Sequence, residues 1–414
     1  MQRISQLVSH LSPQPSGLAA LEQKSPDDVV ITMAIRSPLC KAKKGGFKDT
    51  RTDELMTEMF RQAISFSKVE PGIVEDITVG ITLAPGAMYS ARQASLTAGF
   101  PDRVPISVVN RFCSSGLMAV TDIANKIRAG QIQVGLAVGV ESMSHDPDAG
   151  GPDSSEEIKQ NPSARDASMP MGWTSENVAG DFNISRERMD EVAALSFQRA
   201  ERAETSGFFK DEIVPFKAFV HDPVTGERTT KIVTKDDGIR YGTTKEALLR
   251  VRAAFPQWNP SRTTGGNASQ ITDGAAAVML MKRSKAEELG VKVLGKHITT
   301  AVAGCPPRIM GVGPVFAIPK ALGLAGLTKD DVDLFEINEA FASQYVYSID
   351  ALGLDIEKVN VNGGAIALGH PLGCTGARQL ATGFNELHRR QGKVLVTSMC
   401  IGTGMGAAAV FIRE

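Results

Sequence analysis

The sequence is poor in cysteine, and the few cysteines it has are not grouped. There are five in 414 residues, an odd number, at positions far apart in the chain. No secretory hydrophobic segment precedes them, so they do not predict a disulfide framework, and no C-x-x-C pair predicts a zinc site. We therefore expect free thiols and no bound metal. The cysteines are Cys40, Cys113, Cys305, Cys374 and Cys400.

The chain also lacks an excess of charge and a long hydrophobic run. Its formal net charge is -1 and its pI is about 6.6. A chain of this kind has no positive field to attract nucleic-acid phosphates or an anionic membrane. No apolar stretch reaches the roughly 18 residues that cross a bilayer. We expect a soluble protein with no nucleic-acid partner and no membrane span, and the 42% hydrophobic content predicts a large core with more than one domain.

The N-terminal residues form a segment of their own, "RISQLVSHL" from Arg3 to Leu11. Basic, aliphatic and histidine side chains recur at spacings near three and four, which would place them on one side of a short helix. The segment resembles the N-terminal type of peroxisomal targeting signal, in which a basic and an aliphatic residue precede a His-Leu pair. A frayed tail and a mitochondrial presequence stay open as alternatives. We predict a targeting segment and linker over residues 1–25, with a peroxisomal import receptor as partner.

The remainder of the chain alternates strands with helices. "DVVITMAI" (residues 28–35) and "QVGLAVGV" (residues 133–140) are apolar runs typical of strands covered on both faces. Between them, Leu117, Val120 and Ile123 keep helical spacing, so Cys113 lies in a strand-to-helix turn. The segment after Cys374 repeats this order of helix and strand. The second half therefore echoes the first.

The two halves differ by an insertion. Cys113 and Cys374 are 261 residues apart, whereas the two copies of "GAAAV", at residues 274–278 and 406–410, are only 132 apart. An extra region in the first half explains the difference, and the turn-rich sequence after His145 fits it. We predict an α/β protein with two similar halves and an inserted loop domain. The predicted ranges are residues 26–144 plus 263–288 for the first half, 145–262 for the insertion and 289–414 for the second half.

Cys113 is a candidate nucleophile because of its place before a helix. Unpaired N–H groups at a helix N-terminus favour negative charge, so the position is expected to lower the pKa of the thiol and supply thiolate. A single buried cysteine is more often inert packing. Two C-terminal segments strengthen the case. "NGGAIALGHPLGCTG" carries His370, and "SMCIGTGMG" carries Cys400 before glycines whose N–H groups suit an oxyanion.

Two further segments have a structural interpretation beside a functional one. "FEINEAFA" is a strand that ends in Asn338 and Glu339, placed to orient water or donors, although capping of the next helix is the common alternative. Cys374 occupies the helix start of the second half, so we interpret it as the structural counterpart of Cys113.

Six ordered motifs together resemble those of the thiolase family, over the whole body of the chain. With the N-terminal signal, the likeness is nearest to the peroxisomal 3-ketoacyl-CoA thiolases. The resemblance implies the thiolase fold, with two βαβαβαββ halves in a layered αβαβα arrangement and an inserted loop domain. It also implies a homodimer, and CoA as co-substrate with no permanently bound cofactor. The motifs are "NRFCSSG", "MGWTSENVA", "GGNASQITDGA", "NEAF", "GHPLG" and "CIGTGMG".

The resemblance also implies a role for each site residue in thiolytic cleavage of 3-ketoacyl-CoA, a step of fatty-acid β-oxidation. Cys113 would carry the acyl group, and Cys400 would protonate the departing enolate. His370 would activate Cys113 or stabilise oxyanionic charge. The N–H groups of Cys113 and Gly402 would bind one oxyanion, and His370 with a water held by Asn338 the other. A near-neutral thiol pKa is expected to suit Cys400. Ser269 and Met171 would bind substrate.

Some residues depart from the family pattern. Phe112 stands where many relatives have Gln, Thr82 ends a segment that usually reads Gly-Asn-Val, and Val361 replaces a common proline. None removes a reacting group, but they leave acyl chain length and dimer packing open. Pro170 before Met171 resembles the degradative branch of the family, whereas the short-chain synthetic branch tends to have His there, and this resemblance implies longer acyl chains.

Three other functions can be weighed against this one. A decarboxylating ketoacyl synthase would lack Cys400, and a protein that only carries acyl-CoA or lipid would lack one of the reacting residues. An acetoacetyl-CoA thiolase working in the synthetic direction is the alternative that differs in substrate alone.

Overall fold

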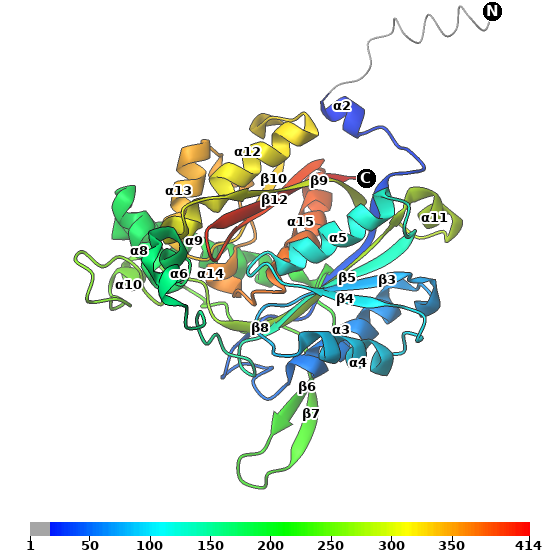
Figure 1. The fold of residues 1–414 in the computed structure, drawn as a ribbon, viewed down its shortest axis with the longest axis horizontal. Helices are drawn as coiled ribbons and strands as arrows, with labels where there is room; N and C mark the ends of the chain where they lie inside the picture. Colours follow the sequence, from blue (N-terminus) through cyan, green and yellow to red (C-terminus); the bar gives the residue numbers. More distant parts are fainter. Residues whose placement is uncertain (1–16) are drawn as a thin grey trace, which may run out of the picture.

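The computed structural model describes residues 17–414. The protein consists of alternating layers of helix and sheet (Figure 1). The predicted signal Arg3 to Leu11 lies outside the described residues. After the short α2 (Leu18–Leu21), the first half contains β1 (Val29–Arg36), α3 (Thr52–Ser67), β3 (Asp76–Gly80), α4 (Ala87–Ala98), β4 (Ile106–Val109), α5 (Ser115–Arg128), β5 (Val134–Ser142) and β8 (Thr272–Lys282). These strands lie in the order β1-β8-β5-β3-β4, and the two-residue β2 (Cys40–Lys41) pairs with β8.

The second half repeats this plan after α11 (Arg283–Glu288). It contains β9 (Gly295–Gly304), α12 (Gly313–Ala325), β10 (Leu334–Ile337), α13 (Ala342–Leu352), α14 (Ala365–Leu368), α15 (Thr375–Arg390), β11 (Val394–Ile401) and β12 (Met405–Arg413). Its strands lie in the order β10-β11-β12-β9, and β9 pairs with β1 to join the halves. The counterpart of β4 is reduced to an isolated bridge between Phe335 and Val359.

The inserted region lies between β5 and β8. It consists of α6 (Glu156–Gln160), α7 (Pro162–Asp166), α8 (Met171–Asp181), α9 (Arg186–Thr205), β6 (Phe216–His221), β7 (Arg228–Val233) and α10 (Lys245–Leu249). The hairpin β6-β7 projects from the lower side of the molecule, and α8 to α10 gather at one flank (Figure 1). Short 3-10 turns complete the described part of the chain: Pro71–Ile73, Phe208–Asp211, Pro307–Val312, Lys329–Asp331 and Ile356–Lys358.

The strands form where the apolar runs predict them. β1 and β5 begin and end within two residues of the predicted ranges, and all of β5 is buried, as a strand covered on both faces should be. The side chains of β8 and β11 are buried almost throughout. The strands of both halves form one ten-stranded sheet. Helices α3 and α4 cover the outer face of its first half and α12 that of its second half, with α5 and α15 between the two halves (Figure 1). The predicted pair of similar α/β halves is confirmed.

The central helices α5 and α15 touch at their N-terminal ends through glycine. A Cβ atom added at Gly116 would lie 2.6 Å from the Gly373 carbonyl oxygen, and one at Gly376 would overlap the backbone of Leu117. Only glycine permits two backbones to come this close. The contact brings the turn before α5 next to the turn before α15, and these turns carry Cys113 and His370.

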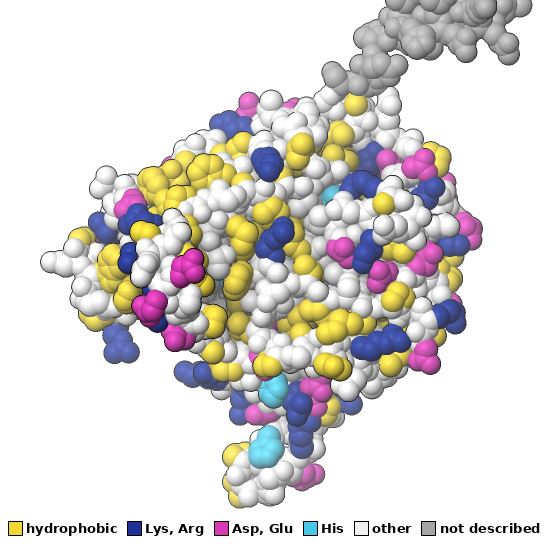
Figure 2. Space-filling model, in the orientation of Figure 1, with side chains coloured by type: hydrophobic (Ala, Val, Ile, Leu, Met, Phe, Trp, Pro, Cys, Tyr) yellow, Lys and Arg dark blue, Asp and Glu magenta, His cyan; other side chains and the backbone are white. Residues whose placement is uncertain are grey.

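Within residues 17–414, one apolar segment of the C-terminal half is long enough to cross a bilayer by length and composition. The segment Pro307–Ala325 has a mean hydropathy of 1.2 over its 18-residue window, so the expectation that no stretch reaches this length is wrong by that measure. However, 56% of the window is buried inside the fold, where its inner side packs on β9 and β12. The outer surface of α12 exposes Phe316 and Leu324. Figure 2 shows hydrophobic side chains gathered at the upper left of the molecule.

A buried ion cluster ties the inserted region to the core. Arg36, at the end of β1, donates to Glu212 at 2.6 Å and to both oxygens of Asp236 at 2.7 and 2.9 Å, and all three side chains are fully buried or nearly so. Burial would lower the pKa of Arg36, but Asp236 and Glu212 raise it above its ordinary value. Thr382 of α15 also donates to Glu212. The cluster therefore joins the insertion to strand β1 of the first half and to the central helix α15.

We predict that Arg36→Met destabilises the protein by about 3–5 kcal/mol, because it leaves two buried carboxylates without their cation. Arg228→Met is the matched control: Arg228 pairs with Glu54 in a part-exposed position, where an ion pair contributes below about 1 kcal/mol. Urea unfolding of both variants measures the difference. Equal losses of unfolding free energy would contradict the assignment of the Arg36 cluster as the anchor.

Candidate active site

The turn that carries Cys113 has a constrained backbone. Phe112 has φ 45°, in the left-handed region that non-glycine residues rarely adopt. Its N–H donates to the Asn110 side chain at 2.9 Å, and its carbonyl accepts from the hydroxyls of Ser115 at 2.7 Å and Thr82 at 3.1 Å. Such a conformation persists only where the surrounding contacts hold it. The two hydroxyl contacts fix the turn that places Cys113 at the start of α5.

The Cys113 thiol is buried and faces backbone donors. Burial raises its pKa to about 11, while the N–H groups of Gly402 and of Cys113 itself lower it. The expectation of a lowered pKa from the helix terminus is therefore wrong for the free protein, because desolvation outweighs the N–H groups. Both N–H groups face the sulfur, so they lie beside any carbonyl carbon that becomes bonded to it.

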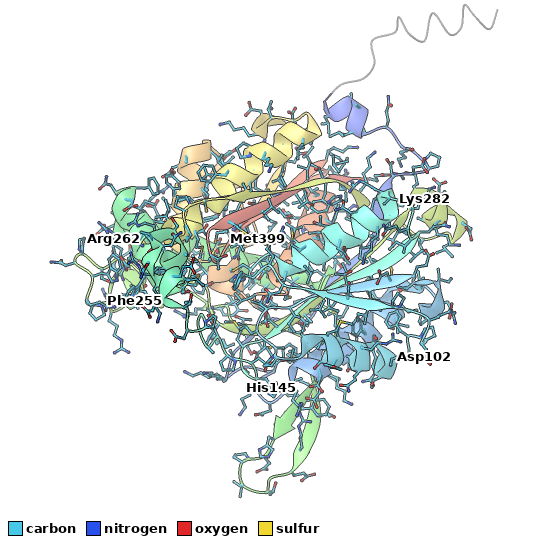
Figure 3. All side chains as sticks on the ribbon, viewed as in Figure 1. Asp102, His145, Phe255, Arg262, Lys282 and Met399 are labelled. Atoms are coloured by element: carbon cyan, nitrogen blue, oxygen red, sulfur yellow. The ribbon has the colours of Figure 1, made fainter. Side chains whose placement is uncertain are left out.

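Cys400 occupies the same site from the other half of the chain. It lies in β11, fully buried, in an apolar cluster with Met310 and Ala340 that Met171 and Phe341 also contact. Burial raises its pKa well above the ordinary value, and the nearby sulfurs of Cys113 and Cys305 raise it further. The expected near-neutral thiol is thus wrong. The two predicted cysteines nevertheless lie within electrostatic reach of each other. Met399, the residue before Cys400, lies near the middle of the molecule (Figure 3).

His370 is buried between two polar side chains that orient its ring. Nδ1 lies 2.6 Å from the Thr375 hydroxyl, which donates to the Pro371 carbonyl, so Nδ1 carries the hydrogen. Nε2 is then the acceptor for the Asn338 amide at 3.2 Å. Burial and the charge of Arg378 lower the pKa of His370 to about 3. The imidazole is therefore neutral, with its basic nitrogen at Nε2.

Asn338 and Glu339 follow β10, as predicted, but they have different contacts. Asn338 Oδ1 is buried and has no hydrogen-bond partner within residues 17–414, so it remains an open acceptor beside His370. Glu339 accepts from Ser196 of α9 at 2.6 Å, Asn360 at 2.9 Å and the Ile366 N–H at 3.1 Å. Glu339 therefore braces the insertion against the second half, and these contacts are not those of a cap on α13.

The predicted substrate-side residues lie beside the sulfurs. A Cβ atom at Gly402 would lie 3.7 Å from Phe112 and 3.8 Å from the sulfur of Met171, so these three residues surround one spot next to Cys113. The Ser269 N–H donates to the Ala340 carbonyl at 3.0 Å, which places its backbone against the Cys400 cluster. Phe255 and Arg262 of the insertion lie to the side of Met399 in Figure 3.

Sequence reasoning missed several residues of this site. Thr375 orients His370, and the apolar side chains of Met310 and Phe341 pack against Cys400. A hydroxyl five residues after a histidine at a helix start could have suggested Thr375. Two residues named as departures now have contacts: Thr82 supports the Phe112 carbonyl, and the buried Val361 accepts from Arg202 through its carbonyl at 2.6 Å.

The site is built from thiols, one imidazole and one amide. No group of three or more His, Cys, Asp or Glu side chains in residues 17–414 is arranged to hold a metal ion. All five cysteines are free. The arrangement can hold an acyl group on one sulfur, move a proton at the other and bind an oxyanion between two N–H groups.

Comparison with known proteins identifies relatives over the full chain. Residues 29–284 match the family described as "Thiolase, N-terminal domain" and residues 291–413 match "Thiolase, C-terminal domain". The chain is 50% identical over 420 residues to a peroxisomal 3-ketoacyl-CoA thiolase of Yarrowia lipolytica, covering 100% of both chains. It is also 50% identical to the peroxisomal 3-ketoacyl-CoA thiolase of Homo sapiens, covering 99% of both.

Solved structures agree with these matches. The dimeric peroxisomal thiolase of Saccharomyces cerevisiae is similar with a TM-score of 0.88 and 48% identity, over 95% of this chain and 100% of that one. Human mitochondrial 3-ketoacyl-CoA thiolase is similar with a TM-score of 0.83 and 36% identity, over 94% and 100%. The chain therefore belongs to the thiolase family and has the thiolase fold.

Proposed function

We propose that this protein is a 3-ketoacyl-CoA thiolase that cleaves 3-ketoacyl-CoA with CoA, giving acetyl-CoA and an acyl-CoA two carbons shorter in fatty-acid β-oxidation. One observation carries the proposal: two cysteines from opposite halves of the chain share a buried site, and the Gly402 N–H points at one of them. Relatives about 50% identical over their full length bear this name.

In the first half-reaction, Cys113 acts as the nucleophile. His370 Nε2 gives up its hydrogen bond from the Asn338 amide and takes the proton of the Cys113 thiol instead, and the sulfur attacks C3 of the substrate. The N–H groups of Cys113 and Gly402, which face the Cys113 sulfur, are proposed to bind the negative charge that develops on the C3 oxygen. The C2–C3 bond then breaks, and its electron pair forms the enolate of acetyl-CoA. Cys400, a protonated thiol in an apolar cluster, delivers its proton to C2, and acetyl-CoA leaves.

The second half-reaction restores both cysteines. The Cys400 thiolate takes the proton of incoming CoA, and the CoA sulfur attacks the acyl carbonyl on Cys113. Collapse of this adduct expels the Cys113 sulfur, which recovers its proton from His370. The high pKa of a buried Cys400 makes it a strong base for CoA, and also keeps it protonated between turnovers. Protonated His370, together with a water molecule held by Asn338, stabilises the negative charge on the thioester oxygen.

The substrate alternative, an acetoacetyl-CoA thiolase, has less support. The acetyl-CoA acetyltransferase of Bacillus anthracis is 37% identical to this chain, against 50% for the peroxisomal thiolase of Yarrowia lipolytica and 48% for the dimeric one of Saccharomyces cerevisiae. Ser269 and Met171 are proposed to contact the substrate beside Cys400 and Cys113. CoA serves as co-substrate, and a human mitochondrial relative has been solved in complex with CoA.

The cellular setting follows from the same relatives. We propose a peroxisomal homodimer, because the similar Saccharomyces cerevisiae protein is described as dimeric and peroxisomal. Arg3 to Leu11 is proposed as the signal read by an import receptor, and a mitochondrial destination is the alternative outcome. The domain ranges also stand as proposals: residues 145–262 as the insertion, 26–144 with 263–288 as the first half and 289–414 as the second.

We predict an acyl-enzyme on Cys113. Incubating the protein with a 3-ketoacyl-CoA in the absence of CoA should add the mass of the shortened acyl group to the peptide that contains Cys113. The peptide of Cys374, a buried cysteine at the equivalent helix start, is the internal control and should stay unmodified. An acyl group on Cys374 or Cys400, or on no cysteine of an active preparation, would refute the nucleophile assignment.

We predict that Thr375→Val lowers kcat by about 10–100-fold with little change in KM, because the ring of His370 loses the partner that fixes its Nδ1 hydrogen. Thr397→Val is the control, since the buried Thr397 hydroxyl has no hydrogen-bond partner in the described chain. Steady-state thiolysis rates measure both. Unchanged turnover in Thr375→Val would remove Thr375 from the site.

We predict that His10→Ala strands the full-length protein in the cytosol without changing its thiolysis rate. Gln6→Ala, a change outside the predicted basic and apolar face, should still allow import. Fluorescence microscopy of tagged protein, with the tag at the C-terminus, measures location. Import of the His10→Ala protein would contradict the signal.

A further inference from the structure

Glu141 is a buried carboxylate that the mechanism above does not use. It lies near the end of β5, fully buried, and it accepts three backbone N–H groups: those of Thr82, Leu83 and Gly373, each at 3.0 Å. A carboxylate with three such donors is held rigidly. Its donors come from two different loops, one in each half of the chain.

The first loop supports the nucleophile. Thr82 and Leu83 follow β3, and the Thr82 hydroxyl donates to the Phe112 carbonyl, one residue before Cys113. The Thr82 carbonyl in turn accepts from the Asn110 side chain at 3.0 Å. A displacement of this loop therefore moves the turn that presents the Cys113 sulfur.

The second loop supports the histidine. Gly373 lies between His370 and Thr375, the two residues joined through Nδ1. A Cβ atom at Gly373 would lie 2.6 Å from the Gly80 carbonyl oxygen, so the loop is pressed against the end of β3. The Gly373 N–H has a fixed direction, and it points at Glu141.

We propose that Glu141 is a positioning residue for the acyl transfer, which sets the Cys113 turn and the His370 loop relative to each other by binding the backbone of both. The inference rests on the proposed function, because the acyl transfer that Glu141 would assist is the reaction proposed above. The geometry is independent of it, because the same carboxylate joins the two loops whatever the substrate.

The charge of Glu141 gives the proposal a second consequence. Burial raises the pKa of Glu141 to about 7, and the three N–H groups lower it. The titratable groups that face it are the thiols of Cys113 and Cys374, whose pKa values its negative charge raises. Above neutral pH Glu141 is ionised, so it opposes formation of the Cys113 thiolate. Removing the charge should make that thiolate easier to form, even while the geometry deteriorates.

The test compares Glu141→Gln, Glu141→Asp and Glu75→Gln. Glu75 is the matched control, a carboxylate that accepts two N–H groups at the opposite end of β5, far from both loops. Two measurements are made on each full-length variant. One is steady-state thiolysis, and the other is the pH dependence of iodoacetamide alkylation at Cys113, followed by the mass of its peptide.

We expect Glu141→Gln to lower kcat by about 10–100-fold at nearly unchanged KM, since misplacement of reacting groups by about 1 Å can cost this much. Its alkylation profile should shift to lower pH. Glu141→Asp keeps the charge but shortens the reach, so its kcat should fall without a shift in that profile. Glu75→Gln should match the unaltered protein in both measurements.

Normal kcat in both Glu141 variants would overturn the proposal. A loss of kcat in Glu141→Gln without any shift of the alkylation profile would also overturn it, because that result would indicate a general structural role. If Glu141→Gln does not fold, as judged by circular dichroism, the Glu141→Asp result decides. Alkylation requires no thiolase turnover. If the proposed function is wrong, the unaltered protein will therefore show no acyl transfer. The alkylation shift tests the role of Glu141 in either case.

Discussion

The close contact between the N-terminal ends of α5 and α15 is the constraint on which the rest of the site depends. Gly116 and Gly376 lack side chains where the two backbones meet, and any larger residue would push the helices apart. Each helix starts just after a turn that carries a candidate site residue. The glycine contact therefore brings equivalent turns of the two halves together in one site, with Cys113 from the first half and His370 from the second.

Burial rather than the helix terminus controls the resting state of both thiols. The N–H groups of Cys113 and Gly402 do favour the thiolate, as position alone suggests, but the apolar surroundings favour the neutral form more strongly. The free protein thus holds two thiols and a neutral imidazole, all uncharged. Because the reactive form of a cysteine is the thiolate, two protonated sulfurs are protected from unwanted reaction in the free protein.

The architecture could be predicted well from the sequence because the periodic spacing of apolar residues depends only on residues that are near each other in the chain. The runs that became β1 and β5, the helix after Cys113 and the insertion before β8 can all be found from neighbouring residues. The motifs also identified Cys113, His370 and Cys400 as candidates. Local patterns did not reveal the loss of the strand that would match β4, where Val359 makes only a bridge. They also gave the wrong pKa direction for Cys113, since desolvation depends on side chains that the fold brings from far along the chain.

The side chains that contact the candidate site residues were hardest to predict for the same reason. Thr375, Glu141 and Glu339 are ordinary polar residues in sequence, and each gains its role from the partners that the fold brings to it. Glu339 follows Asn338 directly, and it binds Ser196 of the inserted α9, so the insertion is fastened one residue away from an amide of the site. The Arg36 cluster fastens the insertion again through Glu212 and Asp236. Two separate buried anchors thus hold Met171 and the rest of the insertion in a fixed position beside Cys113. If substrate contacts the insertion as proposed, these anchors fix the position of that contact relative to Cys113.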